Sequence, residues 1–533
     1  MGELRRYDTR PSTVLPDSTS MKAKSLPIAL VAFALSLGGL LAPAAVAQTG
    51  ADAYRISKRL PLSSPILIGS AGVGAAGRGD LADIFRNPAG LGLLDRGAFS
   101  LSLNTTSVQD DAIFSTVGGP SSASTSELNT TQLGDLSYAY KFPTSQGSMV
   151  LGFGVSQVSS FQRSLRFDGE NGLNSLTDFL MPLSNEFSLV EDGGETFPEF
   201  SRPLSFIGFE TYAIDLNADA VAAGDAVPFS PAVSFGRVQQ SGLVSEEGSV
   251  QEFALAGAME AAEGVMVGVS LNVPFGRYQY TRILDEDDVF NDNDGTNGTT
   301  DFDYLTFTES FESRLVGINL RAGVSAEVSD NVRVGLSVET PTYYSISEDF
   351  DTTLLTGFDN GDSYAYGDAF DEDEGRGSFD YDLRSPWRLE AGVAFDSGPF
   401  SLSGDLEFVD WSQMELDSRD FSFAEQNLDI RRSFESTVNV RIAAEYRMDK
   451  FQLRGGFAGY PDARTSSAGL DRDRGVVSLG FSYLVNRQFA FDFGVMAEVF
   501  EDQYSPYAEV DNAPLVSEEL TRGYVSLGVR MGL

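Results

Sequence analysis

The chain lacks two residue types on which much protein chemistry depends. Its 533 residues include no cysteine and no histidine. Without cysteine there is no disulfide framework and no thiol nucleophile, and without histidine the commonest general base is missing. Carboxylate pairs such as Asp405 and Glu407 remain, but two acids at this spacing on one strand face are ordinary polar lining. We therefore expect no enzyme, no cofactor and no metal centre.

Lysine and long apolar runs are also scarce. Only Lys58, Lys141 and Lys450 lie beyond residue 47, against 29 arginines, and the formal charge is −40. No stretch of about twenty apolar residues is present that would form a membrane-spanning helix. No basic stripe is present that would displace counterions from nucleic acid. The acidic surplus is typical of a solvated acidic surface, and cation collection at the loops is the functional alternative.

The first 47 residues have the features of an export signal behind an upstream extension, residues 1–20. Met21–Ala47 begins with two lysines, continues with an apolar run and ends in the small residues Ala-Val-Ala. This order is that of a secretory signal peptide. We expect an exported mature chain that begins near Gln48.

Connections between the period-two segments of the chain alternate between short and long. The short ones lie at Pro143–Ser148, Ala261–Gly264, Ser329–Asn331, Asp396–Pro399, Met448–Lys450 and Val485–Arg487. The long acidic ones include Asp168–Gly248, Asp285–Asp301 and Asp351–Gly375. Outer-membrane barrels have short periplasmic turns and long external loops. The alternation therefore predicts an all-β fold, a transmembrane antiparallel β-barrel over residues 98–533.

The segments themselves alternate apolar with small or polar residues. In Val265–Phe275 the odd positions are apolar and several even positions are Gly, Ser or Asn, which fits a lipid face and a polar lumen. About fourteen segments lie near 98–106, 135–142, 149–167, 249–260, 265–283, 303–327, 332–350, 377–395, 400–419, 426–447, 451–460, 473–484, 488–501 and 519–533. An even number places both ends of the barrel on the periplasmic side.

Residues 48–97 precede the first strand and are rich in Gly and Ala. A barrel of about fourteen strands has a lumen wide enough to hold them. We expect an N-terminal plug, or hatch, in the lumen. Gly72–Gly77 fits the GxGxxG pattern of dinucleotide-binding proteins, but no βαβ unit follows it, so closely packed plug backbone is the better interpretation.

The largest predicted loop, Asp168–Gly248, is apolar where the others are acidic. Leucines and Phe179 recur at helix-like spacing over Leu173–Leu183, after the possible caps Asn174 and Ser175. Either the loop folds on itself over the barrel mouth, or it presents an apolar groove to a ligand. The candidate ligand-binding residues of this loop are Leu176, Phe179, Leu180, Phe206, Phe209 and Tyr212.

A second loop is rich in aspartate. Asp292 and Asp294, near Asp285, Asp287 and Asp288, have oxygens that could gather around calcium, but the EF-hand spacing fails. A solvated acidic loop is the default interpretation.

The stretch Ser70–Leu91 resembles the N-terminal plug of the FadL/TodX (OmpP1) outer-membrane transporters, whose NPA motif matches Asn87, Pro88 and Ala89. Ser385–Leu389, followed by Gly392–Phe395 and by the Asp-Trp-Ser of residues 410–412, resembles later strands of that family. The resemblance spans most of the mature chain, and only Asn87, Pro88 and Ala89 carry over residue by residue.

The resemblance implies a channel for hydrophobic molecules such as long-chain fatty acids or aromatic hydrocarbons. Family members capture the ligand in an apolar groove between extracellular loops and pass it to a pocket against the plug. A shift of the plug and a gap in the barrel wall then release it sideways. Candidates for pairing with an acid head group are Arg78, Arg86 and Arg333, each of which is more often the partner of a nearby carboxylate.

We therefore expect a passive transporter of hydrophobic compounds in the bacterial outer membrane, a monomer surrounded by membrane lipid. The alternative is a family-like barrel that serves as a structural or secretion-system attachment scaffold and carries no small molecule.

Overall fold

The structure, a computed structural model, describes residues 50–233, 236–291, 293, 301–367, 374–465, 472–507 and 510–533. These residues all belong to one compact unit, Ala45–Leu533. The predicted signal peptide Met21–Ala47 and the candidate calcium ligands Asp292 and Asp294 lie outside the described residues. Among those described, no helix is long and apolar enough to cross a membrane.

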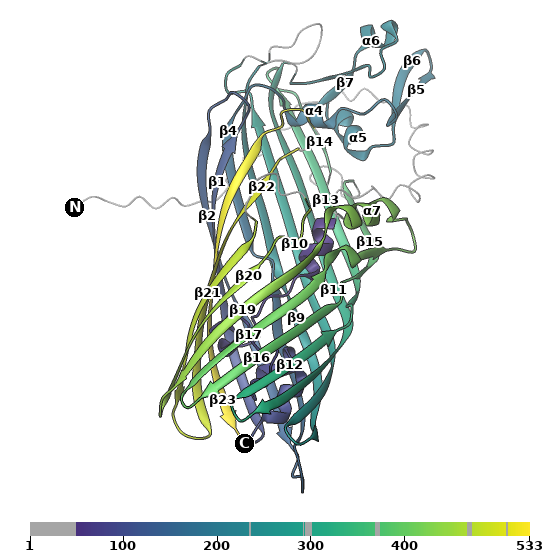
Figure 1. Ribbon diagram of the computed structural model, residues 1–533. Helices are drawn as coiled ribbons and strands as arrows, with labels where there is room; N and C mark the ends of the chain where they lie inside the picture. The colour runs from purple at the N-terminus through teal and green to yellow at the C-terminus, as the bar shows by residue number, and fades with distance from the viewer. Residues whose placement is uncertain are drawn as a thin grey trace, which may run out of the picture. The chain divides into compact units, whose positions relative to one another are not determined.

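A single antiparallel sheet closes into a barrel because its first strand pairs with its last, from Ala98 opposite Gly532 to Ser115 opposite Leu515 (Figure 1). Its strands are β1 (Ala98–Ser115), β2 (Ser122–Lys141), β3 (Met149–Ser160), β4 (Arg163–Asn171), β9 (Val238–Ala262), β10 (Val265–Asp287), β11 (Phe302–Ser329), β12 (Val332–Glu339), β13 (Tyr343–Phe358), β14 (Ser363–Tyr366), β15 (Arg376–Arg384), β16 (Arg388–Ser397), β17 (Phe400–Asp410), β18 (Glu415–Asp417), β19 (Ser436–Arg447), β20 (Phe451–Tyr460), β21 (Arg474–Leu484), β22 (Phe489–Tyr504) and β23 (Leu515–Gly532). In the described part of the chain they make fourteen passes, because β4, β13, β15 and β18 continue a neighbouring strand and β14 is a short hairpin arm. The predicted fourteen-strand barrel is confirmed.

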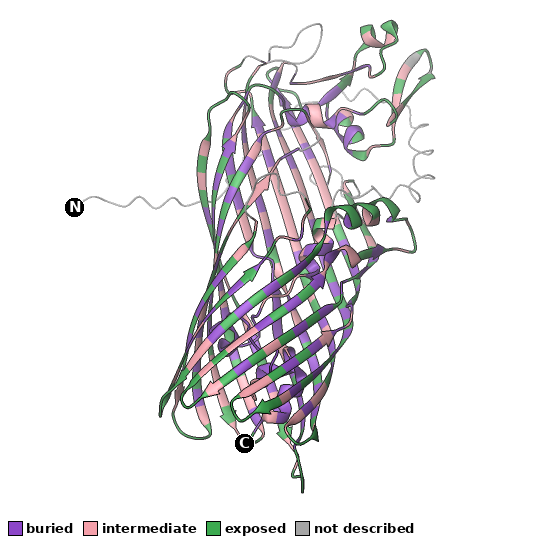
Figure 2. Cartoon of the chain, viewed as in Figure 1, coloured by how far each residue is buried: buried purple, intermediate pink, exposed green. Residues whose placement is uncertain are grey.

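Alternation along the strands sorts the side chains as predicted. In β10, Val269, Leu271 and Phe275 are exposed, whereas Ser270 and Asn272 are buried. The same banding of exposed and buried residues runs along the other strands of the barrel (Figure 2). Apolar side chains outside and polar ones inside are the arrangement that lipid favours.

All six predicted short connections are confirmed, and they lie at one end of the barrel. The predicted long ones are partly wrong, because strands continue into them. β1 and β2 extend to residues 115 and 122, where the sequence predicted a loop from 107 to 134. β4 and the first residues of β9 likewise shorten the largest loop from 168–248 to 172–237, named the excursion below. In the extensions of β1 and β2 the exposed positions, such as Gln109, Asp111, Thr125 and Glu127, are polar, so the apolar outer face that reveals a membrane strand is absent.

Strand length differs strongly around the barrel. β9, β10 and β11 have 25, 23 and 28 residues, whereas β20 and β21 have 10 and 11. About ten residues suffice to cross a bilayer, so the long strands extend beyond it. On the shorter side, helix α7 (Ala424–Ser433) replaces the strand that the sequence predicted from residue 426, and β19 begins only at Ser436.

Residues 50–94, the N-terminal segment, form no strand of the barrel. They contain α2 (Gly50–Ser57), α3 (Pro65–Ile68) and the 3-10 helices η1 (Leu81–Phe85) and η2 (Pro88–Leu93). The segment is drawn in purple among the strands in Figure 1. It contacts β1–β3, β9–β12, β16, β17 and β19–β23, so strands on every side of the barrel surround it.

The excursion carries its own small elements. They are α4 (Leu176–Leu180), β5 (Phe187–Asp192), β6 (Glu195–Phe200), α5 (Pro203–Glu210), β7 (Ile214–Leu216), α6 (Ala218–Ala223) and β8 (Phe229–Pro231). A last short helix, η3 (Trp411–Gln413), follows β17. The predicted helical turn over 173–183 is confirmed as α4, whose N-cap is Ser175.

Candidate functional site

The NPA motif turns the chain against the barrel wall. Asn87 is fully buried and is the N-cap of η2, whose first residue is Pro88. Its Nδ2 donates to the carbonyl of Ala75 at 2.6 Å and to that of Val324 in β11 at 3.1 Å, while its Oδ1 accepts from Ala89 N at 3.1 Å. The Asn87 side chain therefore connects three parts of the molecule: the start of η2, the turn that contains Ala75, and strand β11 of the wall.

Glycines in the wall make room for this turn. Gly268 of β10 and Gly323 of β11 lie opposite each other in the sheet. A Cβ atom at Gly323 would overlap Asn87 Oδ1, and one at Gly268 would overlap Ala89 N. Backbone can approach this closely only where the side chain is a hydrogen atom.

The same device recurs around the lumen. Gly335 and Gly392, paired between β12 and β16, face Ala75 and Ala76, and Gly480 and Gly494, paired between β21 and β22, face Pro65 and Gly69. Residue-by-residue reasoning missed these contacts. The signal that could have found them is a glycine at a lumen-facing position of many strands.

Arginines of the segment pair with carboxylates of the wall. The pairs are Arg55 with Glu246 at 3.0 Å, Arg59 with Glu252 and with Glu339 at 3.1 Å, Arg78 with Glu445 at 3.4 Å and Arg86 with Glu390 at 3.0 Å. Arg333 of β12 lies 3.5 Å from Asp396. The three sequence-derived candidates for an acid head group, Arg78, Arg86 and Arg333, thus each have a carboxylate neighbour.

The candidate residues of the excursion divide into two groups. Leu176 and Leu180 are fully buried in a cluster with wall residues such as Leu165 and Leu284, and Phe179 and Phe209 pack against that cluster. In this respect the excursion folds onto the wall, the first of the two sequence-derived interpretations.

Phe206 and Tyr212 behave differently, because their side chains are 41% and 45% exposed. Their rings lie 5.9 Å from Tyr366 and 4.4 Å from Tyr364 of β14. Two exposed rings, Phe206 and Tyr212, thus lie against the partly buried Tyr366 and Tyr364, and these four side chains are named the outer aromatic patch below.

Carboxyl groups of the excursion have altered acidity. Burial raises the pKa of Asp178, although its oxygen accepts a bond of 2.9 Å from Ser175 N. Burial and the nearby Glu374 raise the pKa of Glu210, at the end of α5. Both groups therefore take up protons at a higher pH than ordinary carboxyls, which makes this surface less charged in mild acid.

A second aromatic cluster lies around α2 and was not anticipated from the sequence. The ring of Tyr54 lies 4.7 Å from that of Trp411 and 5.2 Å from that of Phe434. The same buried cluster, named the inner aromatic cluster, includes Tyr278, Phe311, Tyr344, Tyr381 and Phe423. Tyr54 of the N-terminal segment is thus packed against aromatic side chains of η3 and of the end of α7.

The wall is interrupted between β2 and β4. Ladder pairs between β2 and β3 run from Lys141–Val150 to Asp135–Ser156, and within the described residues none continues from β2 to β4. Hydroxyls bridge the interruption instead, because Ser124 and Ser126 of β2 donate to carbonyls of β4. We call this part of the wall the seam.

β3 bends inward at the seam. Residues 156–162 are all buried, so the alternation of a wall strand is lost there. The carbonyl of Val158 accepts a hydrogen bond of 2.9 Å from the backbone N–H of Leu60 in the N-terminal segment. The edge of the wall is therefore bonded to the segment at the point where it leaves β2.

The barrel is similar to known proteins in both sequence and fold. The family model described as outer membrane protein transport protein (OMPP1/FadL/TodX) matches residues 204–524. A FadL homologue of Pseudomonas aeruginosa has a TM-score of 0.54 at 10% identity, covering 88% of this chain and 98% of its own. The toluene transporter TodX of P. putida has a TM-score of 0.50 at 13% identity over the same shares. These solved structures support the fold, and no curated protein matches the chain.

The family model covers more than half of the sequence, and the barrel is similar in fold to these solved structures. This chain therefore belongs to the OMPP1/FadL/TodX family of outer-membrane proteins that transport hydrophobic compounds.

Proposed function

We propose that this protein is a passive channel that takes hydrophobic compounds, such as long-chain fatty acids, across the outer membrane by a route gated by its N-terminal segment. The observation that carries the proposal is the Leu60–Val158 hydrogen bond, because it joins the N-terminal segment, which contacts strands around the barrel, to the seam in the wall. The hydrated external loops hinder the entry of apolar solutes, and an apolar route through the protein avoids this barrier.

The outer aromatic patch is the proposed capture site. Exposed apolar surface on a soluble loop favours binding of an apolar ligand. Phe206 and Tyr212 supply such a surface beside the partly buried Tyr364 and Tyr366, whereas the buried Leu176 and Leu180 support the loop from beneath. Of the sequence-derived candidates, Phe206 and Tyr212 are thus the ones we assign to ligand contact.

The inner aromatic cluster is the proposed second binding site for the ligand on its route. Tyr54 occupies it in this structure, and an apolar ligand would make similar ring contacts if α2 withdrew. Displacement of α2 would also pull on Leu60, three residues beyond the last residue of α2, Ser57. We propose residues 48–97 as the plug, held shut by the glycine contacts and arginine pairs.

The seam is the proposed exit. Side-chain bonds from serines hold it in place of a continuous backbone ladder, so opening it costs less than separating two paired strands. Release through the wall delivers an apolar ligand into the membrane rather than into water, which suits its chemistry.

Ligand capture can be tested with exposed aromatics of the same excursion. In proteoliposomes, the double variant Phe206→Ala/Tyr212→Ala is expected to lower the initial rate of labelled oleate uptake about tenfold. The control Phe197→Ala, equally exposed but on β6, is expected to keep the rate of the unaltered protein. Equal rates for all three proteins would remove the outer aromatic patch from the route.

Native mass spectrometry of gently extracted protein would identify the compound carried. An apolar molecule of defined mass is expected on a fraction of the barrels. Absence of any apolar ligand, together with no uptake of oleate or toluene, would contradict transport and leave a scaffold role.

A further inference from the structure

A polar cavity lies at the end of the barrel that carries the short turns, on the opposite side of the N-terminal segment from the excursion. Its volume is about 200 Å³, and it is bounded by residues 66–80 of the segment and by the turn-proximal ends of β12, β16, β17, β19, β20 and β23. Because short turns are periplasmic in such barrels, the cavity faces the periplasm. The arginines that line it are Arg78, Arg333, Arg447, Arg454 and Arg530.

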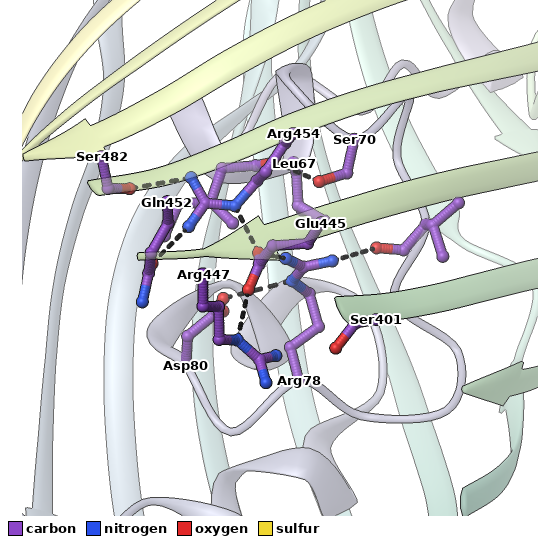
Figure 3. A network of polar contacts seen from close by, with 12 residues as sticks. Leu67, Ser70, Arg78, Asp80, Ser401, Glu445, Arg447, Gln452, Arg454 and Ser482 are labelled. Atoms are coloured by element: carbon purple, nitrogen blue, oxygen red, sulfur yellow. Dashed lines mark hydrogen bonds and ion pairs between the residues drawn. The ribbon is translucent and has the colours of Figure 1, made fainter. Parts of the chain in front are cut away.

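Glu445 is the centre of this cluster (Figure 3). Its carboxylate lies 2.6 Å from Arg454, 2.7 Å from Arg447 and 3.4 Å from Arg78. Arg454 is further fixed by Ser482 and Gln452, to which it donates at 2.8 and 2.7 Å. A single carboxylate thus serves three guanidinium groups.

The remaining pairs are loose. Asp396 lies 3.5 Å from both Arg333 and Arg447, and Asp80 lies 3.3 Å from Arg78. Four arginines therefore share three carboxylates. The Nε atom of Arg333 is buried and has no hydrogen-bond partner among the described residues. A buried N–H group of a cation without an acceptor is costly, so a ligand oxygen is the natural complement.

The positive charge continues into an adjoining cavity of about 330 Å³, to which Arg96 and Arg487 belong together with Arg530. The carboxylates at the two cavities are Asp80, Asp95, Asp396 and Glu445 in their linings, Asp492, 3.3 Å from Arg530, and Asp83, which accepts from the backbone N–H of Arg78 at 3.1 Å. Seven arginines thus face six acids here, although the whole chain carries a formal charge of −40. Guanidinium groups bind carboxylate and phosphate oxygens through paired N–H donors.

We propose that the cavity is a periplasmic binding site for a small anion that bears a carboxylate or phosphate group. Its volume equals that of roughly six or seven water molecules at about 30 Å³ each, enough for phosphate or a short carboxylate. The anion supplies the acceptor that Arg333 lacks and competes with Glu445 for Arg78. It therefore weakens a contact between the N-terminal segment and β19.

The site is independent of transport and is tested by binding alone. Inorganic phosphate and butyrate are titrated separately, by calorimetry at low ionic strength, into the full barrel in neutral detergent. Saturable one-to-one binding of at least one of them is expected. Binding of phosphate alone would identify the group that the site recognises as a phosphate. Binding of butyrate would identify it as a carboxylate. Absence of saturable heat with both would overturn the proposal.

Substitutions locate the site. Arg333→Gln is expected to weaken binding at least tenfold. Arg447→Gln is expected to do the same, and because the Arg447 side chain is 46% exposed this substitution leaves the packing of the barrel intact. Arg282→Gln is the matched control, because that arginine also pairs with a carboxylate, Glu309 at 3.0 Å, but far from the short turns. Retention of full affinity in folded Arg333→Gln and Arg447→Gln, judged by the gel shift of unheated barrels, would place any binding elsewhere.

Discussion

A glycine on the inner face of a strand lacks the Cβ atom that would keep a neighbouring backbone at a distance. Gly268 and Gly323 act in this way for the NPA motif, and Asn87 uses the space to bond with the wall. The segment is therefore positioned by backbone-to-backbone approach as well as by ion pairs. Such contacts tolerate almost no added volume.

Gly323→Ala should loosen the N-terminal segment, because its Cβ would overlap Asn87 Oδ1. Overpacking of a tight contact costs about 1–3 kcal/mol, so the segment should leave the lumen in a larger fraction of molecules. In planar bilayers we expect more frequent open-channel events than in the unaltered protein.

Gly257→Ala is the control for that substitution, since an added Cβ meets no atom within 4 Å there. It should leave the conductance unchanged. Quiet channels in Gly323→Ala would show that the glycine contacts do not hold the segment.

At this scale the sequence was informative only where a signal is local. Asn87, Pro88 and Ala89 form a contiguous motif and could be singled out directly. Their partners Gly268 and Gly323 lie far along the chain, and nothing in one sequence pairs them. The ion pairs of Arg78 and Arg86 were foreseen in kind, but the acids Glu445 and Glu390 were not.

Elements were predicted well inside the membrane and poorly outside it. Fourteen passes and six short turns followed from period-two patterning, which lipid imposes on a barrel strand. The extensions of β1 and β2 were not predicted because polar residues such as Gln109 and Glu127 replace apolar ones on their exposed face. Helix α7 was not predicted because its mixed polar sequence resembles the neighbouring strand segments. The helix buries Ile430 in the inner aromatic cluster, a tertiary contact that the local sequence does not reveal.

Within the excursion, burial separates a supporting role from a binding role. Leu176→Ala should weaken docking of the excursion by about 2–5 kcal/mol, because it empties a fully buried site. Limited proteolysis should cut residues 172–237 much faster in this variant while the barrel itself stays intact.

Leu183→Ala, in the same loop but 63% exposed, should be cut at the rate of the unaltered protein. Equal protection of both variants would mean that the excursion is not held through Leu176.

For the whole molecule, the central claim is that the segment and the seam move together. The chain contains no cysteine, so an introduced pair is the only disulfide it can form. Leu60 and Val158 are joined by a backbone hydrogen bond of 2.9 Å, which brings them close enough for Leu60→Cys/Val158→Cys to be linked. The link would fasten the segment to the bent end of β3.

The most direct test is uptake of labelled oleate by proteoliposomes that hold this double-cysteine protein, before and after reduction. The proposed route predicts negligible uptake while the disulfide is intact and full recovery in dithiothreitol, with either single-cysteine variant active throughout. Equal uptake by the oxidised and reduced forms, with the cross-link verified by mass, would contradict the account.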